Sequence, residues 1–262
     1  MSNPFDLTGR VAIVTGGSDG IGKGVALGLA QAGADIIVVA RTQSKIDAAV
    51  KEIQALGRKS VGISVDVSVQ QQCTDMIQTV ARDFGRIDVL VNNAGSSWGT
   101  TFKRGTLLEL EESDFDGIFA TNVKSGWFCS KAAVPIMREQ ENGGSIINMS
   151  SVGGLLFGRT PSATMGFYSA TKAAILSLTR TEALEWAPKV RVNAIMPGLI
   201  QTDRTRSDPN RRASDEQLAA GIGMLRTGQP NDIAGAAVYL ASDASAWTTG
   251  SAIQIDGGPR QR

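Results

Sequence analysis

A tyrosine and a lysine four positions apart, Tyr168 and Lys172, have the clearest potential for chemistry. At this spacing two side chains lie on the same face of a helix. A phenol with a pKa of about 10 is a poor base at neutral pH, but a nearby cation stabilises the phenolate and lowers that pKa. The chain contains no histidine, which excludes histidine-based triads and histidine-ligated zinc sites. Tyr168 is therefore the best candidate for a general acid–base group.

A glycine-rich loop follows the first apolar segment of the chain. It reads Thr-Gly-Gly-Ser-Asp-Gly-Ile-Gly from Thr15 to Gly22 and leads into a predicted helix. Gly16 permits a tight turn, Gly20 lets backbone approach a pyrophosphate, and Gly22 lets the helix pack closely on the strand. The helix N-terminus attracts phosphate through its unpaired N–H groups. No Gly-Lys-Ser/Thr follows, so the loop predicts a dinucleotide site and excludes a P-loop.

The end of the second predicted strand indicates which dinucleotide binds. An acidic residue there binds the ribose 2′-hydroxyl, whereas an arginine accommodates a 2′-phosphate. Arg41 and Thr42 occupy this position, and no carboxylate does. We expect NADP(H). NAD(H) stays open as an alternative, because Asp19 places a negative charge in the glycine loop and because Arg41 could be a surface residue that stacks on adenine.

The elements that must position these residues alternate along the whole chain. Short β-branched segments are followed by longer amphipathic ones, which predicts a Rossmann-type α/β fold, a doubly wound parallel sheet of about seven strands with helices on both faces. One unbroken series predicts a single dinucleotide-binding domain over residues 1–262. The expected strands are Val11–Thr15, Asp35–Val39, Val61–Val65, Ile87–Val91, Ser145–Met149, Val190–Ile195 and Ala252–Ile255, and the clearest helical segments are Gly22–Ala32, Ser44–Leu56, Val69–Phe84 and Ser169–Trp186.

Composition excludes several classes of function. Lys and Arg number 26 and Asp and Glu 25, giving a net charge of +1, which provides no electrostatic footprint for nucleic acid or an anionic membrane. Two cysteines, Cys73 and Cys129, are too few for a cysteine-rich metal site or a disulfide framework, and we expect no metal. The N-terminus lacks a signal-peptide pattern, and no apolar stretch approaches the roughly 20 residues of a membrane span. We expect a cytoplasmic protein that acts on a small molecule.

One segment, residues 201–223, departs from the strand–helix pattern because it is polar and rich in arginine. It follows a predicted strand, and open α/β sheets bind ligands where strands end. Long loops in compact domains are often lids, so we interpret it as a substrate lid; a solvated surface helix is the alternative. Arg204 and Arg206 within it are candidates to bind an acidic group on a substrate.

A series of short motifs completes the pattern. In chain order they are Thr15-Gly16-x3-Gly20-x-Gly22, Asp66-Val67, Asn92-Asn93-Ala94-Gly95, Asn122, Ser151, Tyr168-x3-Lys172 and Pro197-Gly198-x-Ile200-x-Thr202. Each is modest alone, but the ordered set resembles the classical short-chain dehydrogenase/reductases (SDRs) over essentially the whole chain. The resemblance implies an NAD(P)(H)-dependent oxidoreductase that transfers a hydride between the nicotinamide and a secondary alcohol or ketone. It also implies a homotetramer.

The resemblance assigns a role to each matching residue. Tyr168 would be the general acid–base, Lys172 would lower its pKa and bind the nicotinamide ribose, Ser151 would hold the substrate oxygen, and Asn122 would anchor a proton-relaying water. Ser150 competes with Ser151, which we choose because it precedes Val152-Gly153-Gly154. Asn93 would lie beside the adenosine ribose or stabilise the sheet. The cofactor-binding residues expected are Gly16, Ser18, Asp19, Gly20 and Ile21 near the pyrophosphate, Arg41, Thr42, Asp66 and Val67 near the adenosine, Asn93, Ala94 and Gly95, the pair Tyr168 and Lys172, and Pro197, Gly198, Ile200 and Thr202 near the nicotinamide.

The substrate pocket is less defined by sequence. Trp98, Phe157, Met165 and Leu199, with Ser151, are expected to line it, or else to pack beneath the lid. Ser151 and Tyr168 stand seventeen positions apart, several more than is common in the family, so the segment between them should form part of the pocket wall. Substrates of the 3-oxoacyl, sugar or polyol, and terpenoid or steroid type all stay open. The alternative function is a catalytically inactive dinucleotide-binding regulatory or scaffold protein, which the intact set of four catalytic residues disfavours.

Overall fold

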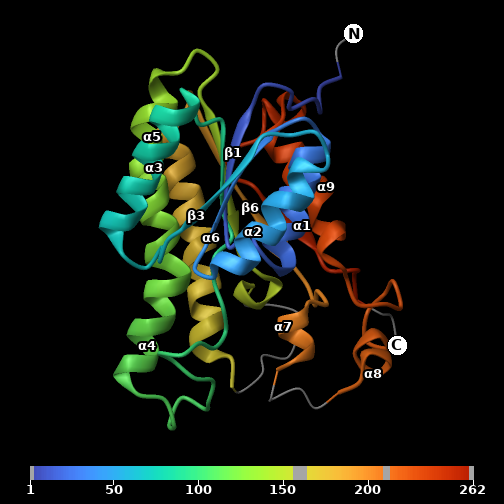
Figure 1. Ribbon diagram of the computed structural model, residues 1–262. Coiled ribbons are helices and arrows are strands. Elements are labelled where there is room, and N and C mark those ends of the chain that lie inside the picture. The colour runs from blue at the N-terminus through green and yellow to red at the C-terminus, as the bar shows by residue number, and fades with distance from the viewer. Residues whose placement is uncertain (1–2, 156–163, 209–212, 260–262) are drawn as a thin grey trace.

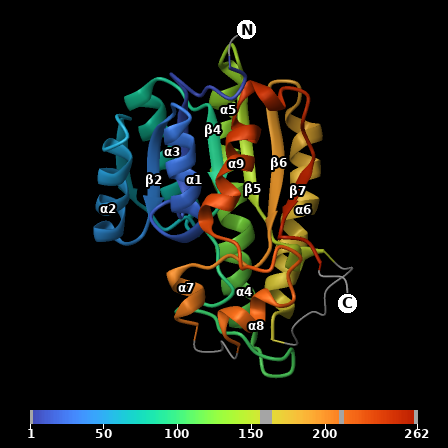
Figure 2. The ribbon, with the colours of Figure 1, turned by 90° about the vertical axis from the view of Figure 1, so that its right-hand side faces the viewer.

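The computed structural model describes residues 3–155, 164–208 and 213–259. Its centre is a seven-stranded sheet in the order β3-β2-β1-β4-β5-β6-β7, and every neighbouring pair is parallel (Figures 1 and 2). This confirms the doubly wound Rossmann-type α/β fold. The strands are β1 (Val11–Thr15), β2 (Asp35–Ala40), β3 (Ser60–Ser64), β4 (Val89–Asn92), β5 (Gly144–Met149), β6 (Val190–Pro197) and β7 (Ala252–Ile255).

Helices cover both faces of the sheet (Figure 2). One layer holds α1, α2 and α9, and the other holds α3, α5 and α6. Two short helices lie in the segment that sequence predicted to be a lid, so its described part is only partly irregular. The helices are α1 (Gly20–Gln31), α2 (Gln43–Gln54), α3 (Gln70–Phe84), α4 (Glu112–Phe119), α5 (Ser125–Glu139), α6 (Gly166–Trp186), α7 (Asp203–Arg206), α8 (Asp215–Ala219) and α9 (Pro230–Ala241).

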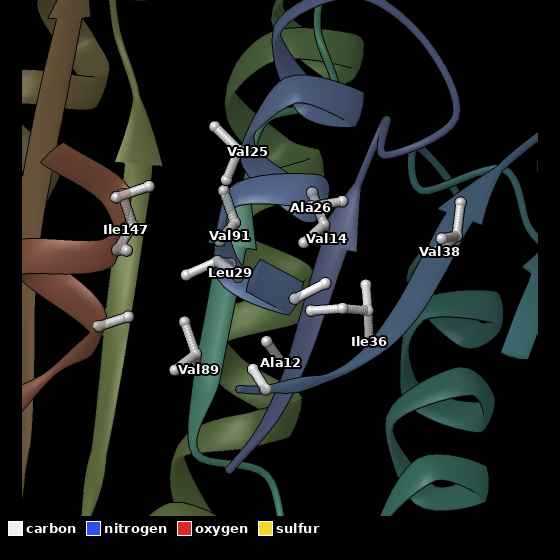
Figure 3. Packing of buried hydrophobic residues seen from close by; sticks show 14 of the residues in the cluster. Ala12, Val14, Val25, Ala26, Leu29, Ile36, Val38, Val89, Val91 and Ile147 are labelled. Carbon is white, nitrogen blue, oxygen red and sulfur yellow. The ribbon is translucent and has the colours of Figure 1, made fainter. Parts of the chain in front are cut away.

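The first strand shows why the sheet needs helices on both sides. Its residues alternate between two apolar cores: Ala12 and Val14 pack toward α1, whereas Val11 and Ile13 pack on the other face. All four side chains are buried. Figure 3 shows Val25 and Leu29 of α1 lying against this strand and its neighbours. Successive side chains of a strand point to opposite faces, so a strand that is apolar throughout is stable only between two helix layers.

The predicted strands agree with the structure to within two residues at their ends, as expected for element boundaries. Val11–Thr15 and Ala252–Ile255 match at both ends, whereas β4 starts at Val89 rather than at Ile87. Within the described residues, no helix is both long enough and apolar enough to cross a bilayer. Because all the strands are parallel, their carboxyl ends, and the loops that follow them, lie at one edge of the sheet.

Candidate functional site

A cleft of about 1510 Å³ lies along the carboxyl ends of the strands. It gathers residues from segments that are far apart in the sequence. Asn122 does not line the cleft, and Phe157 lies outside the described residues. The predicted site residues that line it are Gly16, Ser18, Asp19, Gly20, Ile21, Arg41, Thr42, Asp66, Val67, Asn93, Ala94, Gly95, Trp98, Ser151, Met165, Tyr168, Lys172, Pro197, Gly198, Leu199, Ile200 and Thr202.

The glycine loop between β1 and α1 has a shape that only glycine allows. Gly16 and Gly20 have φ angles of +64° and +53°, in the left-handed region that favours glycine. A Cβ atom on Gly22 would lie 2.2 Å from the Gly16 carbonyl oxygen and 2.4 Å from the Asn93 amide nitrogen. These positions keep the backbone of the loop open beside the start of α1. The loop therefore fits a pyrophosphate, which binds to backbone N–H groups at a helix N-terminus.

Asn93 supports this loop from the neighbouring strand end. Its amide nitrogen donates to the carbonyl oxygens of Thr15 at 3.0 Å and Gly16 at 3.3 Å. The Thr15 hydroxyl in turn accepts a hydrogen bond from the Asn93 backbone N–H at 3.0 Å. Of the two roles expected for Asn93, this geometry corresponds to stabilising the sheet and the loop.

The part of the cleft beside the end of β2, where the sequence analysis expects the adenosine, carries a mixture of charges. Arg41 is exposed there, and the Lys45 ammonium pairs with the Asp19 carboxylate at 2.5 Å. Burial raises the pKa of Asp19, but the hydrogen bonds from Lys45 and from the Gly20 N–H outweigh it, and the pKa is lowered overall. Asp19 is therefore an anion at neutral pH. Lys45, which the sequence analysis missed, neutralises it.

Tyr168, in the first turn of α6, and Ser151, after β5, face the same part of the cleft. A Cβ on Gly153 would lie 3.5 Å from Ser151 Oγ and 3.7 Å from Tyr168 Cε1, so the two side chains converge there. Burial raises the pKa of Tyr168, whereas the Ser151 hydroxyl and the Arg104 cation lower it; the net shift is upward. The phenol is thus protonated at neutral pH.

The neighbouring serine has a different environment. The buried Ser150 hydroxyl donates to the Lys172 carbonyl oxygen at 2.8 Å. The Ser151 hydroxyl accepts a hydrogen bond from the Gly153 N–H at 3.1 Å and can still donate. Ser150 is engaged in the support of α6, which leaves Ser151 as the serine that can meet a ligand.

Lys172 lies one helical turn beyond Tyr168. Its ammonium donates to the Met149 carbonyl oxygen at 2.8 Å and lies 5.6 Å from the centroid of the Tyr168 ring. Burial lowers the pKa of Lys172 to about 8, because a charged ammonium is less well solvated in the interior. The lysine thus titrates near the physiological range.

Asn122 lies behind the cleft, in a short π-helix (Ala120–Lys124) that joins α4 to α5. Such π-bulges are frequent at functional sites. Its amide donates to the Ser96 carbonyl at 2.9 Å and accepts from the Ser96 N–H at 2.8 Å. A Cβ on Gly95 would lie 3.0 Å from Asn122 Oδ1 and 3.5 Å from Lys172 Nζ. Asn122 is therefore close to Lys172, with the backbone of Gly95 beside both.

The cleft also includes residues that sequence reasoning did not single out. Arg104 and Asp208 line it, together with Trp98, Met165 and Leu199, which were expected to line a substrate pocket. Arg104 lies in a loop without periodicity or motif, and only its contacts reveal it. Arg204 lines the cleft, whereas Arg206 is exposed on α7 and does not.

Comparisons with known proteins agree with this arrangement. A model of the family described as enoyl-(acyl carrier protein) reductase matches residues 16–259. A 2-dehydro-3-deoxy-D-gluconate 5-dehydrogenase of Escherichia coli (strain K12) is 39% identical over 266 residues, covering 97% of this chain and 96% of that protein. The chain belongs to the short-chain dehydrogenase/reductase family.

Solved structures of other SDRs superimpose on this one along nearly all of its length. A 3-oxoacyl (acyl-carrier-protein) reductase from Agrobacterium tumefaciens C58 with NADP bound gives a TM-score of 0.86 at 33% identity, covering 97% of this chain and 96% of that one. A 7α-hydroxysteroid dehydrogenase complexed with NADH and 7-oxo glycochenodeoxycholic acid gives 0.89 at 32% identity, with 100% and 99% covered. This SDR is accordingly an NAD(P)-dependent oxidoreductase, as the sequence predicted.

Proposed function

We propose that this SDR transfers a hydride between a nicotinamide dinucleotide and a secondary alcohol or ketone, with Tyr168 as the general acid–base. The observation that carries the proposal is the convergence of Tyr168 and Ser151 in the same cleft as the glycine loop. The dinucleotide supplies the hydride, and the residues of the chain supply orientation and proton transfer.

Protonation supports this division of roles. A phenol whose pKa is raised by burial holds its proton at neutral pH, so Tyr168 can donate it to a carbonyl oxygen during reduction. Ser151 would donate a second hydrogen bond to the same oxygen and stabilise the developing negative charge. Lys172 would exchange protons with solvent through the neighbourhood of Asn122, because its pKa of about 8 lies close to neutrality.

The glycine loop and Arg41 together favour NADP(H) as the cofactor. Gly16, Gly20 and Gly22 leave room for the pyrophosphate. Arg41 is exposed, lines the cleft and follows β2, the position at which an arginine accommodates a 2′-phosphate in this type of fold. The related reductase from Agrobacterium tumefaciens has NADP bound, whereas the related steroid dehydrogenase has NADH bound. NAD(H) is thus the second cofactor to test.

The relatives point to three substrate types, namely sugar acids, acyl thioesters and steroids. We propose a ketone or secondary alcohol of this range, bound between Trp98, Met165 and Leu199. These three side chains line the same cleft as Tyr168. They provide apolar contact, and the polar groups nearby set orientation.

Turnover by the wild type and by Tyr168→Phe tests the proposal. Ketones would be offered with NADPH or NADH, and oxidation of the cofactor would be followed by absorbance. We expect Tyr168→Phe to lower kcat by about a thousandfold, within the range of general acid–base catalysis. Tyr239→Phe is the matched control, since the Tyr239 hydroxyl bonds Thr248 at 2.8 Å and does not line the cleft.

Cofactor binding separates the possible outcomes. Nicotinamide fluorescence would measure the Kd of each cofactor for the same variants. Equal turnover in Tyr168→Phe and the wild type would contradict the role of Tyr168. Tight cofactor binding without turnover of any ketone would favour the inactive regulatory protein instead.

We also propose that the protein is a homotetramer, as its family resemblance implies. Trp247 is 101% exposed and Leu184 84% exposed within one chain, and large apolar side chains exposed to this degree often mark interfaces. Light scattering of the purified protein would give the mass of the assembly, and a monomeric mass would contradict this proposal.

A further inference from the structure

A cluster of charged groups lies around Trp98 in the wall of the cleft. The guanidinium carbon of Arg104 lies 4.3 Å from the centroid of the Trp98 ring, and that of Arg204 lies 4.4 Å away. The two arginines come from segments one hundred positions apart in sequence. Asp208 completes what we call the Trp98 cluster: Trp98, Arg104, Arg204 and Asp208. All four residues line the cleft.

Arg104 is held in one orientation and binds a carboxylate. Its Nη1 atom donates to Asp208 Oδ2 at 2.6 Å, and its Nε and Nη2 atoms donate to Ser97 Oγ at 3.1 and 2.6 Å. The side chains of Arg104 and Asp208 are only 15% and 12% exposed. An ion pair sheltered to this degree is stronger than one on the open surface, because water screens it less. Arg104 thus holds one carboxylate, that of Asp208, in the wall of the cleft.

The Trp98 cluster has one more positive charge than negative. Among the described residues, Arg204 has no carboxylate partner; it donates to Ser96 Oγ and to the Trp98 carbonyl. Burial lowers the pKa of Arg204, and so do the neighbouring cations Arg41 and Arg104. Within the cluster, two arginines and one aspartate give a net charge of +1, and Arg41 and Asp19 act on Arg204 with opposite signs. An anionic group on a ligand would find positive charge here.

Arg104 lines the same cleft as the pair Tyr168 and Ser151. The Arg104 cation is one of the two groups that lower the pKa of the Tyr168 phenol against the effect of burial, as a positive charge near a phenol does. A carboxylate held by Arg104 would place the rest of a small substrate next to Tyr168 and Ser151.

We propose that Arg104 is a specificity-determining residue that binds a carboxylate of the substrate, in competition with Asp208. The preferred substrates are then oxo acids and the corresponding hydroxy acids rather than neutral ketones. This inference rests on the proposed function, because it names the substrate class of the same site. On binding, the carboxylate of the substrate would take the place of Asp208 on Arg104, and Arg204 would balance the added charge.

Substitution of Asp208 distinguishes competition with the substrate from a purely structural ion pair, because the two models predict opposite effects on the binding of acids. If Arg104 and Asp208 only fasten two loops together, removing either partner weakens binding of every ligand alike. If Asp208 competes with the substrate, Asp208→Asn strengthens binding of acids while Arg104→Gln weakens it. The two substitutions therefore separate the models by the sign of their effect.

The experiment uses matched pairs of ligands, 4-oxopentanoate and 5-oxohexanoate, each beside its methyl ester. Isothermal titration of the NADP⁺-loaded protein gives the ratio of ester Kd to acid Kd, and steady-state reduction with NADPH gives the corresponding ratio of kcat/KM. We expect the wild type to prefer the acids by about tenfold, as one charge-assisted hydrogen-bonded pair allows. Arg104→Gln should bring the ratio close to one, and Asp208→Asn should raise it about threefold.

Two neighbouring substitutions serve as controls. Arg206→Gln and Asp203→Asn alter the pair on α7 whose charged atoms are 3.9 Å apart and which is open to solvent, and they should leave the ratio unchanged. A wild-type ratio near one, or an acid affinity that falls in Asp208→Asn, would overturn the inference. Absence of binding by any acid would overturn it as well. Failure of the proposed function has a different signature, since turnover would then be absent for acids and esters alike while the binding ratio still reports on Arg104.

Discussion

At the proposed cofactor end of the cleft, which the glycine loop forms, backbone makes the binding surface: Gly16 and Gly20 have positive φ angles, and a Cβ on Gly22 would collide with the Gly16 carbonyl oxygen. At the proposed substrate end, which the Trp98 cluster forms, long side chains make it, with Arg104 and Arg204 against Trp98. Replacing a glycine at the first end forces backbone to move. Replacing an arginine at the second end changes charge and leaves the sheet in place. The first surface suits a ligand common to many enzymes, and the second can change with the substrate.

At the proposed cofactor end, the largest expected effect is at Gly22. In Gly22→Ala the new Cβ would lie 2.2 Å from the Gly16 carbonyl oxygen and 2.4 Å from the Asn93 amide, so the loop and the start of α1 must separate. We expect cofactor affinity to fall by at least about a hundredfold, equivalent to roughly 3 kcal/mol, and the midpoint of thermal unfolding to fall. Fluorescence titration with NADPH and a melting curve would measure both.

Gly235→Ala is the control for this substitution. Gly235 also lies within a helix, α9, but nothing lies within 4 Å of its Cβ position. Alanine is favoured over glycine in a helix interior by about 0.5–1 kcal/mol, so this variant should be slightly more stable and bind cofactor normally. Unchanged NADPH affinity in Gly22→Ala would show that the loop tolerates a Cβ and would contradict the backbone account of the cofactor end.

Lys172, where the two ends meet, predicts a dependence of stability on pH. Burial lowers its pKa in the folded state to about 8 from an ordinary value of 10.5. The unfolded chain therefore binds the proton more tightly than the folded protein does. The loss of folding stability caused by burying the charged lysine is present in full below pH 8, shrinks as pH rises and vanishes above about 10.5. We expect Lys172→Met to gain stability relative to the wild type by roughly 3 kcal/mol more at pH 7 than at pH 10.5.

Urea unfolding at several pH values would measure this difference. Lys131→Met, which removes an exposed lysine from α5, is the control for the loss of one surface ammonium. The pH dependence attributed to Lys172 would be refuted if, at every pH, Lys172→Met and Lys131→Met changed the free energy of unfolding by equal amounts relative to the wild type.

The same contrast explains how far the sequence could predict the site. Alternating apolar segments predicted the parallel α/β sheet, and the glycine loop has a fixed position after β1, so residues of the glycine loop and of the strand ends that line the cleft could be named from the sequence. Arg104 and Asp208 could not, because they lie 104 positions apart in irregular segments and meet only through the folded loops. The role of Lys45 could not be predicted for a similar reason, since its partner Asp19 belongs to a different element. Helices α4 and α5 are not among the clearest helical segments of the sequence, and a π-helix that contains Asn122 joins them in the structure.

Arg41 should have a smaller effect that depends on the cofactor. In Arg41→Ala the 2′-phosphate of NADPH would lose its charged partner, whereas NADH has no such group. We expect the KM for NADPH to rise about tenfold, since one charge-assisted contact is lost, and the KM for NADH to change less than twofold. Lys51→Ala, exposed on α2 outside the cleft, is the control. An equal rise for both cofactors would assign Arg41 to the adenine rather than to the phosphate.

The smallest expected effect is at Asp19. It tests whether a change of charge alone, without a change of backbone, can strengthen NADPH binding at the proposed cofactor end. Asp19 caps α1 through the Gly20 N–H at 2.7 Å and also holds Lys45. Asn is as good a cap as Asp, so Asp19→Asn keeps the loop, removes a negative charge and releases Lys45 toward the phosphate. We expect the KM for NADPH to fall about threefold, in keeping with a partly exposed charge pair, and the KM for NADH to stay the same. Asp47→Asn, whose carboxylate meets only the exposed side chain of Gln43 among the contacts described, is the matched control. A rise in the NADPH KM would mean that Asp19 positions the loop through its charge, so that the two ends of the cleft would differ less than their structures indicate.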